Sequence, residues 1–200
     1  VYLGMQRYEE AAEEFENAIE ANPDVAESYS NLAGALRRQG RLDEAITLSQ
    51  DAANHPAAGF FIRANALRIA VECGSRFPVE AMEGALPARE TRALEFAVAL
   101  FNPRHERLWD VQSESVAETV IHLGYALFML HRFPEALALA QDAQAHGYRS
   151  AEILRIQVTA LFELDRESEV HALATERLAE MNAVTLTILG QIAANDGNLP

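Results

Sequence analysis

The chain has 200 residues, a formal net charge of −14 and a hydrophobic fraction of 50%, which excludes a disordered chain and allows a sizeable core. The acidic surplus repels phosphate backbones and argues against a nucleic-acid binder. The single cysteine, Cys73, excludes a disulfide framework, and no apolar run is long enough to span a membrane.

All 16 basic residues are arginine, which excludes a P-loop lysine and a Schiff-base lysine. The missing lysine and the many alanines favour a GC-rich bacterial genome. Val1 starts directly in an apolar helical pattern, and residues 195–200 read as a turn before another helix. We therefore expect a fragment of a longer protein, with a cytoplasmic location.

Apolar residues recur every three or four positions in the first 55 residues, which predicts amphipathic helices. The three stripes are Tyr8, Ala11, Ala12, Phe15, Ala18 and Ile19, then Tyr29, Leu32, Ala33 and Leu36, then Leu42, Ala45, Ile46, Leu48 and Ala52. Later in the chain we expect a helix over residues 88–101. A connector or short helix over 104–113 then contains Trp109, the single tryptophan.

Short polar residues and glycine mark the expected helix ends. Asp24 and Glu27 have the spacing of a capping box, and so does Ser115 with the glutamate three residues later. Ser150 is expected to cap the helix that follows it, and Gly40 to end the helix that precedes it. The breaks are short, so consecutive helices should form antiparallel hairpins.

A self-comparison gives a period of 34 residues, in which Tyr8 maps to Leu42 and Val120 to Leu154. The repeated pattern is Tyr29-x2-Leu32-Ala33-x2-Leu36, and it returns as Val120-x2-Leu123-Gly124-x2-Leu127 followed by Phe133, Ala136 and Ala140. This pattern resembles the tetratricopeptide repeat. The resemblance implies an all-α fold, a right-handed superhelical solenoid of antiparallel helix pairs.

The resemblance divides the chain into three parts. Residues 1–86 are expected to hold N-terminal repeats, 87–116 a degenerate or inserted helical segment, and 117–200 C-terminal repeats. A diverged repeat that stacks normally is the alternative for the middle segment. Either arrangement changes the neighbour contacts of the stack and so its local groove.

Candidate catalytic or metal-binding residues are few. Glu118 and His122 are four residues apart, as are Glu167 and His171, and this spacing places both members of a pair on one helix face. No third ligand is suggested, so we predict no metal and no cofactor. Cys73 ends an apolar helix and is interpreted as a packing residue.

In the family that the chain resembles, the first helix of each repeat lines a concave groove that holds a peptide or a partner helix. The groove residues predicted by register are Arg37, Arg68, Tyr125, Phe128, Arg155, Thr159 and Phe162. The same register adds Glu27, Ser30, Gly34, Phe61, Ala64, Val71, Glu118, Ile121, Met129 and Glu152. Phe128 and Phe162 have an alternative role, which is packing between neighbouring helices.

Some relatives clamp the terminal carboxylate of heat-shock chaperones with groove lysines and asparagines. This chain has no lysine, and Gly34, Arg68, Tyr125 and Thr159 occupy the matching asparagine position. By the same register Asn31 and Asn65 fall one helical face away. A chaperone clamp is therefore not expected.

The resemblance implies a non-catalytic protein-interaction module or scaffold that binds a protein or peptide in its groove. One alternative is the repeat region of a larger bacterial enzyme of the glycosyl- or sulfotransferase type. Another is a scaffold that self-associates through exposed apolar ends of the solenoid, at Val1, Tyr2, Ile188 and Ile192.

Overall fold

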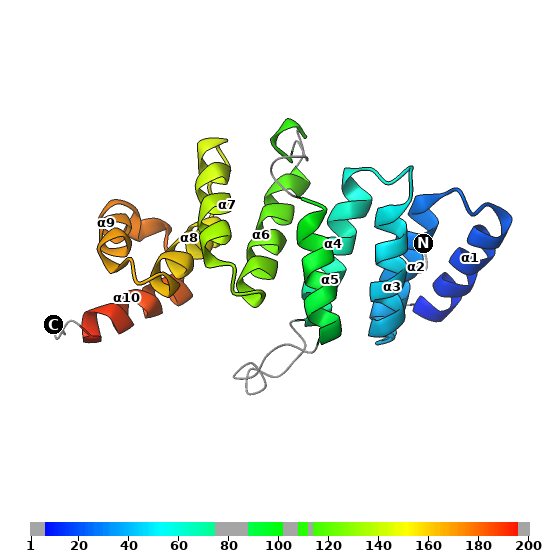
Figure 1. Ribbon diagram of the computed structural model, residues 1–200, viewed down its shortest axis with the longest axis horizontal. Helices are drawn as coiled ribbons and strands as arrows, with labels where there is room; N and C mark the ends of the chain where they lie inside the picture. Colours follow the sequence, from blue (N-terminus) through cyan, green and yellow to red (C-terminus); the bar gives the residue numbers. More distant parts are fainter. Residues whose placement is uncertain (1–6, 75–87, 102–107, 112–113, 196–200) are drawn as a thin grey trace. The chain divides into compact units, whose positions relative to one another are not determined.

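The computed structural model describes residues 7–74, 88–101, 108–111 and 114–195, and these ranges contain helices, turns and no strand. The helices are α1 (Tyr8–Ala21), α2 (Ala26–Arg38), α3 (Leu42–Asn54), α4 (Phe60–Gly74), α5 (Ala88–Ala99), η3 (Leu108–Asp110), α6 (Glu114–Met129), α7 (Phe133–Ala145), α8 (Ala151–Glu163), α9 (Glu167–Arg177), η4 (Leu178–Glu180) and α10 (Ala183–Asn195) (Figure 1). The predicted all-α class is confirmed. Val1, Tyr2 and the predicted boundary at residues 86 and 87 lie outside the described residues.

The chain forms two compact units, residues 1–108 and 109–200. In the first unit every helix from α1 to α5 packs on the next in chain order, while α2 also contacts α4 and α3 also contacts α5. In the second unit α6 to α10 pack in the same order, and α6, α8 and α10 contact one another in sequence. Each unit is thus a stack of helical hairpins, as in a tetratricopeptide-like solenoid.

The turn inside a hairpin has the same conformation in three repeats. Gly40, His131 and Asp165 each have a positive φ, of 80°, 54° and 55°. The N–H of the next residue then bonds back to the preceding helix, as Arg41 does to the Leu36 carbonyl at 3.0 Å. This left-handed residue ends one helix and reverses the chain, which is the role predicted for Gly40.

An Arg–Glu pair opens each of the helices α1, α3, α7 and α9. Arg41 precedes α3 and its guanidinium bonds Glu44 at 2.5 and 2.7 Å. The same pair recurs as Arg7–Glu10, Arg132–Glu135 and Arg166–Glu169. The glutamate lies in the first turn, where the helix dipole favours a negative charge.

Of the predicted N-terminal caps, that of Ser150 is confirmed, because its hydroxyl accepts the Ile153 N–H at 3.2 Å. The Asp24–Glu27 capping box is wrong: α2 starts later, with Val25 at the N-cap and no side-chain cap bond. Asp24 instead donates its backbone N–H to Asn22 Oδ1. Ser115 lies inside α6, which already begins at Glu114.

Small residues line the contacts between helices. Ala26, Ala33, Ala35, Ala45, Ala126, Ala136, Ala140, Ala143 and Ala160 are fully buried, and so are the larger Leu67, Leu94, Ile153, Leu154 and Ile156. Alanine at a helix crossing lets the two axes approach closely, which the 34-residue pattern of small residues predicted. Cys73 is buried at the end of α4, as expected of a packing residue.

Ile188 and Ile192 do not form the exposed apolar face predicted for the end of the solenoid. Both are buried, because α10 packs against α8 and α9. The large apolar side chains exposed in the described part of this unit are instead Leu178 and Leu186. Across the described residues, no helix is both long and apolar enough to cross a membrane.

Candidate functional site

The first unit has an open groove of about 320 Å³ between α2 and α4. Its lining residues are Glu27, Ser30, Asn31, Gly34, Phe61, Ile62, Asn65 and Arg68. The groove therefore contains five of the positions that register predicted, including Arg68. It also contains Asn31 and Asn65, which corrects the expectation that they lie on another face.

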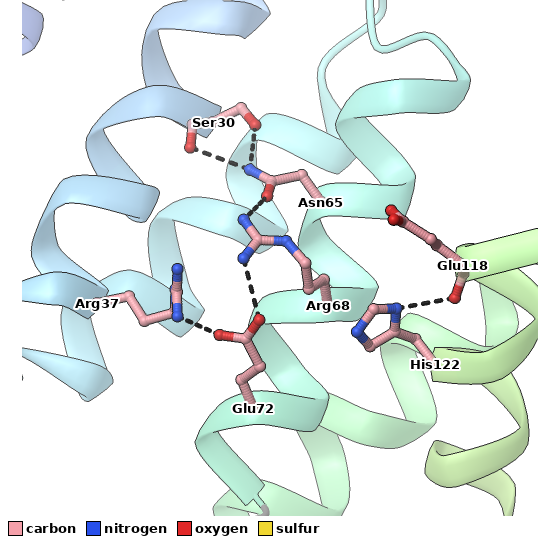
Figure 2. A network of polar contacts seen from close by, with 7 residues as sticks. All are labelled: Ser30, Arg37, Asn65, Arg68, Glu72, Glu118 and His122. Atoms are coloured by element: carbon pink, nitrogen blue, oxygen red, sulfur yellow. Dashed lines mark hydrogen bonds and ion pairs between the residues drawn. The ribbon is translucent and has the colours of Figure 1, made fainter. Parts of the chain in front are cut away.

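A chain of polar contacts joins the two helices along this groove (Figure 2). The Asn65 amide donates to Ser30 Oγ at 2.7 Å and to the Ser30 carbonyl at 3.3 Å. Asn65 Oδ1 accepts from Arg68 at 2.5 Å, and Arg68 also donates to Glu72 Oε1 at 3.0 Å. These bonds fix the position of Arg68 at the groove wall.

Arg37 of α2 is buried and belongs to the same network of polar contacts. Only 6% of the residue is exposed, and its Nη1 donates to Glu72 Oε2. Burial lowers the pKa of Arg37 from its ordinary value, and the charge of Glu72 opposes that shift. Its Nε is buried and has no acceptor. The structure thus places Arg37 as a support for Glu72, and through Glu72 for Arg68.

The second unit carries a similar network, built from α6, α8 and Asn182, the residue that precedes α10. Glu152 accepts from the Tyr125 hydroxyl at 2.6 Å, from Arg155 Nε at 2.9 Å and from Asn182 at 3.1 Å. Arg155 also donates to the Tyr125 hydroxyl, and its guanidinium lies 4.7 Å from the centroid of the Tyr125 ring. Partial burial lowers the pKa of Arg155. The predicted residues Tyr125 and Arg155 are therefore brought together.

The other predicted residues of this unit are more dispersed. Phe128, Thr159 and Phe162 are half-buried on α6 and α8. The Phe128 ring lies 6.0 Å from the ring of Phe133, so part of its surface packs between α6 and α7. Their role as groove residues stays a prediction.

The two Glu–His pairs considered as metal ligands in the sequence lie in no larger ligand set: among the described residues, no group of three His, Cys, Asp or Glu side chains converges. His122 Nδ1 instead donates to the backbone carbonyl of Glu118 at 2.8 Å (Figure 2). His122 Nδ1 therefore carries the hydrogen in this contact.

Sequence reasoning placed Glu152 in the groove by register but did not identify Glu72, and it assigned neither glutamate its role as the acceptor at the centre of a network. A signal was present in the first unit. Ser30 and Asn65 are 35 residues apart, and so are Arg37 and Glu72, which places each pair side by side on adjacent first helices. In the second unit the contacts span other separations, so no single offset would have found them.

These observations define a helical-repeat protein with a groove between the first helices of adjacent hairpins. The family model of the tetratricopeptide repeat matches residues 1–59. This match, together with the stacked helical hairpins of the fold, supports a tetratricopeptide-type helical repeat protein. No curated protein sequence matches it.

Proposed function

We propose that this chain is a non-catalytic protein-interaction module that holds an extended peptide of a partner protein in the groove between α2 and α4. Tetratricopeptide repeats are generally protein-interaction modules, and the match to residues 1–59 includes all of α2 and α3. The observation that carries the proposal is Phe61, which is 63% exposed and lines the groove. Exposed aromatic residues are frequent anchors of protein interfaces.

The wall of the groove favours a bound peptide over a small molecule. The groove is open along its length, and polar side chains of both helices border it. Asn31 is exposed and makes no side-chain hydrogen bond to the described residues, so its amide is free to pair with a peptide backbone. A cytoplasmic location and a protein partner belong to the same proposal, and the net charge of −14 argues against a nucleic-acid partner.

In the second unit we propose a further partner-binding surface over Tyr125, Phe128, Arg155, Thr159 and Phe162. The support is the Tyr125–Arg155 pair, which presents an aromatic ring and a guanidinium on the first helices of two hairpins. Substituting Phe162→Glu tests this surface apart from the first groove.

Self-association is a second candidate, favoured by Leu178 and Leu186, which are 56% and 45% exposed near the end of the second unit. Light scattering over a range of concentrations tests it. A monomer at the highest concentration, unchanged by Leu178→Glu, would remove this candidate.

The test of the groove uses Gly34. Gly34 lines the groove, and a Cβ added there meets no atom within 4 Å, so Gly34→Tyr introduces a bulky ring at the groove wall. The matched control is Ala138→Tyr, at an exposed position on α7. We expect Gly34→Tyr to lose partners captured from cell extract while its melting temperature stays at or above that of the wild type. Equal capture by both variants would reject the groove.

A further inference from the structure

The two ends of the groove in the first unit differ in chemistry. The Ser30–Asn65 and Arg37–Glu72 contacts both span 35 residues, so α2 and α4 run side by side in one register. Glu27 therefore lies beside Phe61 and Ile62 at one end, and Gly34 beside Arg68 at the other. Glu27 and Gly34 are seven positions apart on α2, which corresponds to about 10 Å along the helix axis.

At the first end an aromatic ring and a carboxylate are both available. Phe61 is exposed, and its ring contacts the Phe60 ring edge-on, with 5.5 Å between the centroids. Phe60 in turn contacts Phe101 edge-on, at 6.0 Å. The Phe61 ring is thus supported by Phe60, which is itself packed against Phe101. Glu27 is exposed and its carboxylate makes no hydrogen bond or ion pair to the described residues.

At the second end the cation is already bonded. Arg68 donates to Glu72 and to Asn65, and Glu72 also accepts from Arg37 (Figure 2). The two arginines share one carboxylate, so this end has no unpaired negative charge, whereas Glu27 has no cation partner among the described residues and leaves the Phe61 end of the groove negatively charged.

We infer that the Phe61–Glu27 end of the groove recognises an arginine or lysine side chain of an extended partner peptide. The inference rests on the proposed function and specifies its ligand. A guanidinium over the ring gains a cation–π contact, and the adjacent carboxylate gains a charge-assisted hydrogen bond. The chain's net charge of −14 attracts basic segments at longer range.

Other side chains fit this end less well. An apolar side chain would cover Phe61 but would remove water from the Glu27 carboxylate without replacing its hydrogen bonds. An acidic side chain would be repelled by the same carboxylate. A long basic side chain satisfies both groups, because its aliphatic stem covers the ring while its head reaches the carboxylate.

The test begins with a phage-displayed library of random decapeptides, selected on the full chain after depletion on Gly34→Tyr. Synthetic versions of enriched peptides, and analogues with each basic residue replaced by alanine, are then titrated against the wild type and Glu27→Gln. The control Glu9→Gln removes a first-turn carboxylate from α1, with the same change in net charge and no place in the groove.

We expect the enriched peptides to share a basic residue, and its replacement by alanine to weaken binding about tenfold, the scale of a strong interface contact. Glu27→Gln should weaken the parent peptide by a similar factor and leave the alanine analogue unchanged, while Glu9→Gln binds as the wild type does. This coupling assigns the basic residue to Glu27 rather than to general charge attraction.

Two results would overturn the inference in different ways. If peptides enrich and depend on the groove but carry no basic residue, or ignore Glu27→Gln, the ligand assignment fails and the proposed function stands. If no peptide enriches on the wild type after the depletion, because Gly34→Tyr and the wild type retain the same peptides or none, the groove is not a peptide site and both proposals fail.

Discussion

Gly124 of α6 lies directly against Ile156 of α8: a Cβ added to Gly124 would come within 2.5 Å of Ile156 Cδ1 and 3.1 Å of its Cγ1. Ile156 is fully buried, so its side chain is enclosed on its other sides. The glycine is what allows these two first helices to pack closely in the second unit. At the equivalent position of the earlier repeat, Ala33 is accommodated and fully buried.

Gly124→Ala should therefore destabilise the chain. Alanine gains about 1 kcal/mol of helix propensity over glycine, but overpacking a buried contact costs typically 1–3 kcal/mol. We expect a net loss of about 1 kcal/mol in urea unfolding. The matched change Gly34→Ala meets no atom within 4 Å and should stabilise by about 0.5–1 kcal/mol. Equal stabilisation by both would show that Ile156 repacks freely.

The left-handed turn residues give a second pair of predictions of opposite sign. Gly40 has φ 80°, so Gly40→Ala forces a side chain into a conformation that costs about 1–2 kcal/mol. Asp165 already carries this strain at φ 55°, and Asp165→Gly should stabilise by up to about 1 kcal/mol after the entropic cost of glycine. Thermal melts measure both. A stabilising Gly40→Ala would contradict the shared turn geometry.

Glu72→Gln tests the network beneath the groove. The change leaves the buried guanidinium of Arg37 without its counter-charge. Removing one partner of a fully buried ion pair lowers the free energy of unfolding by about 3–5 kcal/mol. Since the Glu72 side chain is 33% exposed, we expect a smaller loss of about 2 kcal/mol.

Two further variants check the cause of that loss. Adding Arg37→Met to Glu72→Gln removes the unpaired charge and should recover part of the stability. Glu135→Gln breaks an ion pair with Arg132 in which both side chains are exposed, and should melt close to the wild type. If Glu135→Gln is as damaging as Glu72→Gln, burial of Arg37 is not the reason.

Glu44 provides a prediction for pH. The hydrogen bond from Arg41 lowers the pKa of the Glu44 carboxyl below its ordinary value. A lowered folded-state pKa means that this pair stabilises the fold above the carboxyl's unfolded pKa. Its contribution is lost as the pH falls through the folded value. Carbon-detected NMR titration should show the low pKa, and Arg41→Gln should return it to the ordinary range; no change in Arg41→Gln would contradict the pairing.

Local pattern was sufficient for the helices and the repeat. The stripes around Ala11, Leu32 and Ala45 predicted buried faces because helical periodicity depends only on neighbours along the chain. The Arg–Glu pairs at 34-residue spacing, such as Arg7–Glu10 and Arg41–Glu44, are a further repeat signal readable from sequence. The capping box at Asp24 failed because a helix start also depends on where the preceding turn places the chain.

Register also predicted much of the groove, since Glu27, Gly34, Phe61 and Arg68 all line it. Register predicted both Arg37 and Arg68 as groove residues, but the structure places only Arg68 in the lining of this groove. Both Arg37 and Arg68 follow the first-helix pattern, yet one is buried under Glu72 and the other borders the groove. Burial depends on how far two helices approach and on which side chains fill the space between them.

The sequence by itself determined the helical class, the hairpin repeat and the absence of a lysine-based clamp, because composition and short-range periodicity carry that information. Only the tertiary structure decided that Gly124 meets Ile156, that Glu72 joins two arginines, and that Phe61 stays exposed. The Gly124–Ile156 and Arg37–Glu72 contacts join residues more than 30 positions apart. The exposure of Phe61 depends on how the helices that carry such contacts pack. The distances between stacked helices, which no local pattern encodes, set their geometry.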